Sequence, residues 1–345
     1  MIRAILTALL LLTGTPALAH EHPLVIAHRG ASGERPEHTR AAYDLAIDQG
    51  ADVIEPDLVM SKDGVLIVRH ENEIGETTDV ASYPDFADRR RTTTIDGQSV
   101  TGWFTEDFTL AELKTLRARE RLPQFRPGNA TFDGREPILT FQEVIDIARA
   151  GSIRAGRTIG VAPELKHPSH FRELGLDMVA SFVAVLQTND LTGKDAPVLI
   201  QCFEVGALKD LRQAGVAAPL LQLIAAGQGP ADVRTLVQTV MTSPPGLADI
   251  ATYADWIGVE TTLIEPRDAS GAAQPATSLI ADAHEAGLKV VGWTFRAENV
   301  FLPKGDRRGV LSAQHGDLTG QLRRHYALGI DAVFSDFPAI AVAAR

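Results

Sequence analysis

The chain has 345 residues, a formal net charge of −11 and a single cysteine. This charge argues against a broad nucleic-acid surface, which needs a basic footprint, but it leaves room for phosphate chemistry in a local pocket. One cysteine excludes an intrachain disulfide, so stability must come from a hydrophobic core. The length is compatible with two domains or with one large α/β barrel.

The first 19 residues have the pattern of a secretory signal peptide. Arg3 supplies a positive region, residues 4–12 an apolar core, and Ala17-Leu18-Ala19 a cleavage site. The apolar core is too short to span a bilayer, and no later stretch approaches the roughly 20 apolar residues required. We therefore expect an exported protein without stable membrane insertion, with a retained N-terminal anchor as the alternative. The sequence leaves the oligomeric state open.

Apolar, β-branched runs alternate with helix-like stretches along the rest of the chain. The expected strands are Leu24–Ala27, Val53–Val59, Ile159–Leu165, Val198–Cys202, Leu220–Ile224, Trp256–Val259, Val290–Thr294 and Ile330–Phe334. Helices are expected at Thr39–Gln49, Phe141–Ala150, Leu174–Gln187, Glu204–Ala214, Ser278–Ala286 and Leu318–Leu328. Eight alternations of strand and helix indicate an α/β fold, a closed TIM-type (β/α)8 barrel. We expect one such domain over residues 20–345.

A hairpin is expected directly after the second strand. Asp63-Gly64 is a strong turn signal, and the apolar run Val65–Val68 follows it. A turn centred there pairs Asp57 with Val68 and brings His70 back to Glu55.

An insertion at about 72–136 interrupts the periodicity, with several Pro, Gly and Thr residues and three consecutive arginines. We expect it to lie over the barrel mouth, to contain short helices such as Leu110–Arg117, and to help form a substrate cleft.

Polar side chains gather where the expected strands end, which is the edge of such a barrel that carries the chemistry. Glu55, Asp57 and Glu164 offer oxygen ligands that suit a hard cation, Ca²⁺ or Mg²⁺. His28 and His70 are the natural proton donor and acceptor beside that cation. The alternative is that the carboxylates form ordinary ion pairs with basic neighbours.

Two basic residues are candidates for holding phosphate oxygens, namely Arg29 and Lys166, and their alternative role is to compensate the carboxylates. Three further residues are possible substrate contacts or mere packing at the mouth: Trp293, Phe295 and Gln201. We expect Asp336 to cap the following turn, with the orientation of a basic side chain as the alternative. Glu37 and His38 are expected at the start of the first helix, with a contact from Glu37 to Arg29 as a further option.

In order along the chain, several fragments resemble the motifs of the glycerophosphodiester phosphodiesterases, in particular their periplasmic bacterial branch. The fragments are His28-Arg29-Gly30-Ala31-Ser32-Gly33, Pro36-Glu37-His38-Thr39, Glu55-Pro56-Asp57, Lys62-Asp63-Gly64, Pro163-Glu164-Leu165-Lys166, Trp293-Thr294 and Ser335-Asp336-Phe337-Pro338. The chain departs from the family at Glu71, where members commonly have Asp after the second histidine.

The resemblance implies a distorted TIM barrel that hydrolyses glycerophosphodiesters to glycerol 3-phosphate and an alcohol. It implies that one histidine deprotonates the glycerol 2-hydroxyl for attack on phosphorus, that the other protonates the departing alkoxide, and that water then opens a cyclic phosphate. It also favours Ca²⁺ over Mg²⁺ and a periplasmic address, with secretion as the alternative. Two other functions stay open: a phospholipase of related barrel design, and a solute-binding protein that captures glycerophosphodiesters without cleaving them.

Overall fold

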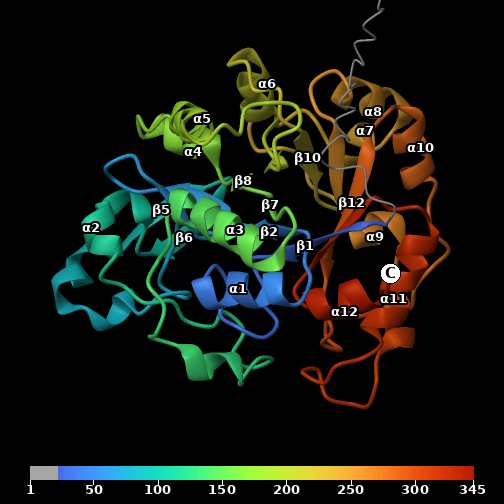
Figure 1. The fold of residues 1–345 in the computed structure, drawn as a ribbon, viewed down its shortest axis with the longest axis horizontal. Coiled ribbons are helices and arrows are strands. Elements are labelled where there is room, and N and C mark those ends of the chain that lie inside the picture. Colours follow the sequence, from blue (N-terminus) through green and yellow to red (C-terminus); the bar gives the residue numbers. More distant parts are fainter. Residues whose placement is uncertain (1–21) are drawn as a thin grey trace, which may run out of the picture.

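The computed structural model describes residues 22–345, so the expected signal peptide lies outside the described residues. Its centre is a barrel of parallel strands with helices around it (Figure 1). The barrel strands are β1 (Leu24–His28), β2 (Val53–Glu55), β3 (Asp57–Met60), β7 (Gly160–Val161), β8 (Glu164–Leu165), β9 (Ile200–Cys202), β10 (Leu220–Ile224), β11 (Trp256–Glu260), β12 (Lys289–Phe295) and β13 (Ala332–Ser335). The last strand, β13, pairs with β1 and closes the ring.

Two of the expected strands are each divided into two pieces. The run 53–59 breaks at Pro56 into β2 and β3, and the run 159–165 breaks at Pro163 into β7 and β8. A proline has no N–H to donate to the ladder, which explains both breaks. Because β2 pairs with β7 and β3 with β8, each divided strand still fills one position. The ring therefore has eight positions, and the expected distorted (β/α)8 barrel is confirmed.

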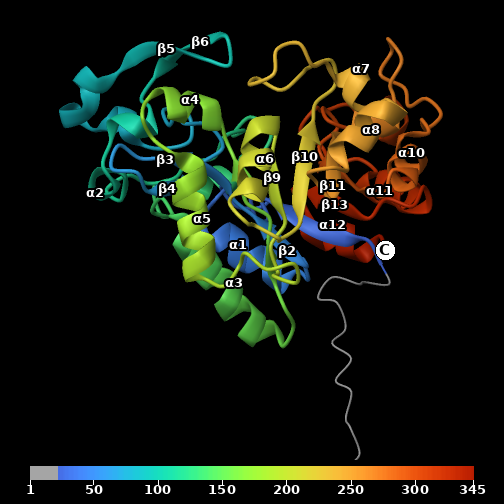
Figure 2. The same cartoon turned by 90° about the horizontal axis from the view of Figure 1, so that it is seen from above.

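Helices follow the strands and cover the outside of the barrel (Figures 1 and 2). They are α1 (Arg40–Asp48), α3 (Phe141–Ala155), α4 (Pro168–Glu173), α5 (Met178–Thr188), α6 (Val205–Gln213), α7 (Gln238–Met241), α8 (Pro244–Ile250), α9 (Thr261–Ile264), α10 (Leu279–Glu285), α11 (Leu318–Ala327) and α12 (Pro338–Ala343). The helix expected from Leu174 begins only at Met178. Gly175 has a φ of 79°, which ends α4, and the Asp177 carboxylate then caps α5 by accepting from Ala180 N. No helix among residues 22–345 is long and apolar enough to cross a membrane.

The hairpin after the second strand is present, but its register differs from the expected one by one residue. Strand β4 (Leu66–Val68) runs antiparallel to β3, and Leu58, not Asp57, lies opposite Val68. The reason is the turn: Ser61 N bonds Val65 O, so the loop has three residues and its last, Gly64, has a φ of 79°. Such three-residue loops with a left-handed glycine are common in hairpins. His70 follows the paired residues and reaches the barrel mouth.

The insertion at 72–136 contains ordered short elements at one side of the barrel (Figure 2). An antiparallel hairpin of β5 (Arg91–Ile95) and β6 (Gln98–Gly102) was not expected, although its Asp96-Gly97 turn is a strong hairpin signal. The expected helix 110–117 is shorter, α2 (Leu110–Leu113), with a capping box between Thr109 and Glu112. Short 3-10 helices complete the structure: η1 (Val80–Ser82), η2 (Pro84–Arg89), η3 (Thr105–Asp107), η4 (Asn129–Phe132) and, after β12, η5 (Lys304–Asp306).

The hydrophobic core has two parts, one between strands and helices and one inside the barrel. Cys202 is fully buried in the outer part and is a free thiol, as expected of a residue that fills space. Helix α3 packs closely on α1 at Gly151, where an added Cβ would lie 2.6 Å from Ile47 Cδ1. The inner part fills the barrel, so the site is confined to its carboxyl edge.

Candidate active site

The interior side chains of the barrel alternate with those facing the helices, and this alternation leads to the site. The interior packing residues are Leu24, Ile26, Val53, Ala162, Leu199, Leu221, Leu223, Trp256, Val291, Ala332 and Phe334. Two residues beyond a member of this set, on the same face, lie His28, Glu55, Glu164, Gln201 and Trp293. The topmost interior layer is therefore polar, and it lines a cavity of about 330 Å³.

Three carboxylates meet at the floor of this edge. Each of Glu55, Asp57 and Glu164 is buried, and each offers an oxygen within 4.8 Å of the others. Asp57 and Glu164 are partners in the parallel β3–β8 register. At such a separation two unit charges repel by about 3 kcal/mol in a protein-like dielectric. The sequence prediction that these residues converge is confirmed.

The carboxylates respond to burial and to one another. Burial and the charge of Asp57 raise the pKa of Glu55 well above its ordinary value. Burial, with the charge of Asp57, raises the pKa of Glu164 to about 8. Asp57 Oδ1 is buried and accepts no hydrogen bond from any described residue. Hard divalent cations prefer several carboxylate oxygens as ligands. Three close carboxylates, one of which has an oxygen without a hydrogen bond in the described part of the chain, therefore fit such an ion.

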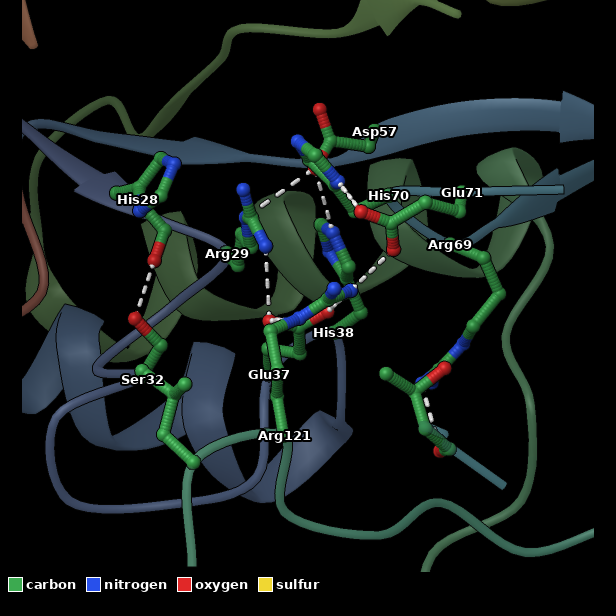
Figure 3. Close-up of polar contacts among 12 residues, drawn as sticks. His28, Arg29, Ser32, Glu37, His38, Asp57, Arg69, His70, Glu71 and Arg121 are labelled. Atoms are coloured by element: carbon green, nitrogen blue, oxygen red, sulfur yellow. Dashed lines mark hydrogen bonds and ion pairs between the residues drawn. The ribbon is translucent and has the colours of Figure 1, made fainter. Parts of the chain in front are cut away.

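Arg29 binds the acidic cluster through both backbone and side chain (Figure 3). Its N–H donates to Glu55 Oε2 at 2.7 Å, its Nη1 donates to Glu37 at 2.9 Å, and its Nε lies 3.3 Å from Asp57 Oδ2. A φ of 60° at Arg29 turns that N–H toward the cluster, a backbone strain of the kind concentrated at functional sites. Lys166 Nζ lies 2.9 Å from Glu164 Oε1.

The alternative interpretation was that the carboxylates form ordinary ion pairs. Such ion pairs are present, but they do not neutralise the three carboxylates. Two cations, Arg29 and Lys166, face three carboxylates, and Arg29 is shared with Glu37. The contact between Glu37 and Arg29 is confirmed, whereas the expected helix-start role of Glu37 and His38 is wrong. Thr39 caps α1, and His38 Nε2 instead bonds Asp57 Oδ2 at 2.9 Å.

His28 is held by a carboxylate from the other end of the chain. Its Nδ1 lies 2.6 Å from Asp336 Oδ1, just after the last barrel strand. Burial and the charge of Arg29 lower the pKa of His28 to about 4, so the ring is neutral near pH 7. A neutral ring with Nδ1–H donating to Asp336 has Nε2 as a proton acceptor. Asp336 therefore orients an imidazole, which matches the alternative expectation that it orients a basic side chain and not the expected turn cap.

His70 has a matching arrangement. Its Nδ1 bonds the Glu71 carboxylate (Figure 3). Its Nε2 lies 3.3 Å from Lys166 Nζ. Burial, together with the charges of Arg29 and Lys166, lowers the pKa of His70 to about 3. Both imidazoles thus have a carboxylate on Nδ1. Glu71 makes this hydrogen bond at the position where the resembling family commonly has Asp.

Two arginines of the insertion were missed by the sequence analysis. Arg121 donates to Glu37 and to Glu71 Oε2, the latter at 2.5 Å, and Arg126 donates to Glu298 and to Asp336 Oδ2, the latter at 2.5 Å. Each arginine therefore holds the carboxylate that holds a histidine. Their sequence neighbourhood is aperiodic, so no local pattern identifies them.

The possible substrate contacts divide into two groups. Trp293 and Gln201 line the cavity, and Gln201 Nε2 lies 3.3 Å from Glu55 Oε1. Phe295 does not line it: the residue is fully buried, and its ring packs edge-on against His325 of α11 at 4.9 Å. The cause is a shift of the β12–β13 register between Gly292 and Phe295, which turns Phe295 toward the helices.

A TIM barrel that brings an acidic triad, two basic groups and two carboxylate-paired imidazoles together at one edge is suited to phosphoryl transfer, as in the class of barrel hydrolases. The comparisons with known proteins define the family. The sequence model of the glycerophosphoryl diester phosphodiesterase family matches residues 28–340. The glycerophosphodiester phosphodiesterase GDPD6 of Arabidopsis thaliana is 36% identical over 343 residues, which cover 93% of this chain and 85% of the plant protein. The chain therefore belongs to this family and is a hydrolase.

Solved structures share the fold. A putative glycerophosphoryl diester phosphodiesterase from Silicibacter pomeroyi superposes with a TM-score of 0.67 at 20% identity, covering 95% of each chain. An Oleispira antarctica phosphodiesterase in complex with the product sn-glycerol-3-phosphate gives a TM-score of 0.62 at 22% identity, with 94% of this chain and 96% of the other covered. At these identities the likeness supports the barrel architecture alone.

Proposed function

We propose that the protein hydrolyses glycerophosphodiesters to glycerol 3-phosphate and an alcohol by acid–base catalysis beside a divalent cation. The observation that carries the proposal is the pair of imidazoles, His28 and His70, that line one cavity together with Glu55 and Glu164 of the acidic triad and the two basic groups. Family membership supports the reaction class, and the glycerol 3-phosphate complex of the Oleispira relative is consistent with the product.

Proton transfer in this proposal uses Nε2 of each ring, because Nδ1 is engaged by a carboxylate. One imidazole takes the proton of the glycerol 2-hydroxyl as its oxygen attacks phosphorus, and the bond between phosphorus and the alcohol oxygen breaks. The other imidazole gives a proton to that departing oxygen. Water then opens the cyclic phosphate with the two roles exchanged. The geometry does not assign a role to either ring.

Arg29 and Lys166 are proposed to bind non-bridging phosphate oxygens, since both line the cavity beside His70. Glu55, Asp57 and Glu164 are proposed to hold the cation, which would add positive charge where negative charge develops on the phosphate. An all-oxygen site is open to Ca²⁺ and Mg²⁺. We propose Ca²⁺, because the resemblance to the family and the export that the N-terminal sequence favours both point to this ion.

We also propose export to the periplasm, on the strength of the N-terminal pattern in residues 1–19. Expression of the full chain in a Gram-negative host, followed by fractionation and N-terminal sequencing, tests this. Enrichment in the periplasmic fraction with a new terminus near His20 supports the proposal. A full-length chain in the cytosol contradicts it.

Purified protein incubated with glycerophosphocholine tests the reaction. We expect glycerol 3-phosphate to form with added Ca²⁺ and its formation to stop when a chelator is added. Mg²⁺ in place of Ca²⁺ tests the choice of ion. If glycerophosphocholine binds but no product forms with any divalent ion, the chain is a capture protein and not a phosphodiesterase.

A further inference from the structure

A second cavity, of about 600 Å³, adjoins the catalytic one. The two share walls that include His70, Lys166, Phe203, Glu260 and Trp293. The second cavity extends from the end of β9 to the β5–β6 hairpin and the segment before α7, which stand on the same side of the barrel in Figure 2. Its size is within the range of small-molecule sites. A substrate bound at the catalytic edge can therefore extend in two directions.

The two directions differ in charge. Of the charged residues, the catalytic cavity alone is lined by three arginines and one carboxylate: Arg29, Arg267, Arg296 and Glu55. The second cavity alone is lined by Asp96, Glu204 and His167, and by no arginine among residues 22–345. We name the second cavity the acidic lobe. Arg267 has no carboxylate partner among the described residues and donates to Phe301 O. A positively charged group would be repelled in the first direction and attracted in the second.

Two of the carboxylates that line the acidic lobe form no ion pair with a basic residue that the structure describes. Glu204 is 4% exposed, accepts hydrogen bonds from N and Oγ of Ser169 at 2.9 and 2.8 Å, and forms no ion pair with a described residue. Glu260 accepts from Ala226 N and Thr262 Oγ1 and likewise has no ion pair among residues 22–345. Asp96 is paired with His167.

This shortage of positive charge favours a cationic ligand. Burial raises the pKa of Glu204 to about 7, and the charges of Asp232 and Asp96 act in the same direction. A cation in the lobe would hold Glu204 ionised and would offset the cost of its burial.

Two aromatic rings form the wall between the cavities. Phe203 and Trp293 pack edge to face with centroids 5.8 Å apart. Lys166 Nζ lies 5.7 Å from the centroid of Phe203, so this wall already receives an ammonium group. Aromatic faces beside carboxylates are the surroundings in which proteins bind ammonium and quaternary ammonium ions.

We propose that the acidic lobe binds the alcohol part of the diester and selects alcohols that carry an ammonium or quaternary ammonium group. The inference rests on the proposed phosphodiesterase function, and it assigns the glycerol part to the direction of Arg267 and Arg296. The alcohol released from a preferred substrate is then an amino alcohol, and a neutral alcohol such as glycerol lacks the charge that the lobe attracts.

Two substrates that differ in the alcohol test the lobe: glycerophosphocholine and glycerophosphoglycerol. The ratio of their kcat/KM values is measured for the wild type, Glu204→Gln, Glu260→Gln and the double variant. Glutamine keeps an acceptor oxygen for Ser169 or Thr262 but removes the charge. We expect the ratio to fall about tenfold in the double variant, which corresponds to a loss of about 1.4 kcal/mol. Glu173→Gln, an exposed change on α4, is the matched control and should keep the wild-type ratio.

Calorimetric titration with choline chloride, against sodium chloride at the same ionic strength, gives a readout that does not need turnover. Choline binding by the wild type that is lost in the double variant supports the lobe, even if neither diester is cleaved and the proposed function fails. Thermal unfolding shows whether the variants are folded. If the double variant is not folded, the two single variants are compared instead. An unchanged substrate ratio in a folded variant, or no choline binding by the wild type, overturns the inference while leaving phosphodiesterase activity on glycerophosphoglycerol intact.

Discussion

The barrel and the insertion supply the same site by different means. Barrel strands bring His28, Glu55 and Glu164 into the cavity because every second side chain of a strand faces the interior. The insertion brings in Arg121 and Arg126, which contact the carboxylates behind the histidines rather than the cavity floor. The barrel strands thus supply side chains of the site itself. The orientation of its histidines depends on the insertion, which has no regular periodicity.

The largest effect should come from the two histidines of the site. His28→Ala or His70→Ala removes a proton donor and acceptor, and we expect kcat to fall by about 10³-fold. Glycerol 3-phosphate release from glycerophosphocholine measures it, and far-ultraviolet circular dichroism checks the fold. Near-wild-type turnover by either folded variant would show that its imidazole is not needed for proton transfer.

The next effect concerns the acidic triad. Glu164→Gln removes one of the converging charges, and we expect cation affinity to weaken by at least about 100-fold. Activity measured over a range of Ca²⁺ concentrations should shift to higher concentrations, while Glu173→Gln should leave the curve in place. The same curve for both variants would mean that the triad holds no catalytic ion.

A smaller effect should come from the insertion. Arg126→Met removes one of the two arginines that hold the Asp336 carboxylate, the other being Arg296, and we expect kcat to fall about tenfold with little change in KM. Arg126→Lys, which can still bind one carboxylate, should recover part of the loss. Arg119→Met, at an exposed arginine of the same segment, is the control. If KM rises while kcat is kept, the insertion acts on substrate binding and not on the histidine.

The smallest effect should come from Glu71→Asp. The shorter side chain keeps the charge that His70 Nδ1 contacts but alters the geometry of its bond to Arg121. We expect kcat to fall by about threefold, a loss of roughly 0.7 kcal/mol. Glu71→Gln, which removes the charge, should cost more; an equal effect of the two variants would mean that distance alone matters.

Much of the fold could be predicted from the sequence because a barrel repeats one local pattern. Apolar runs and helix stops located the strands, the strand ends located His28 and the triad, and the expected hairpin brought His70 back to them. The predicted substrate contact of Phe295 was wrong because the alternation of side chains ends at a register shift in β12. No residue in the sequence marks that shift. The exact hairpin register could not be predicted either, since Asp63-Gly64 marks a turn but does not give the number of residues in the loop.

The contacts of the insertion could not be predicted in this way. Arg121 and Glu37 are 84 residues apart, and Arg126 and Asp336 are 210 residues apart. Pairing over such distances is determined by how the insertion folds onto the barrel mouth, and its charges look the same in the sequence as those of any exposed loop. The β5–β6 hairpin is the exception, because Asp96-Gly97 could have identified it.

The hydrogen bond between His28 and Asp336 joins the first strand of the ring to the residue after the last one, 308 positions later. A chain that lacks β13, whether still being synthesised or cut short, has every other strand of the barrel but no partner to orient this imidazole. Hydrolytic competence therefore arrives with the final closure of the ring, and the rate at which activity appears during refolding measures when the two ends of the molecule meet.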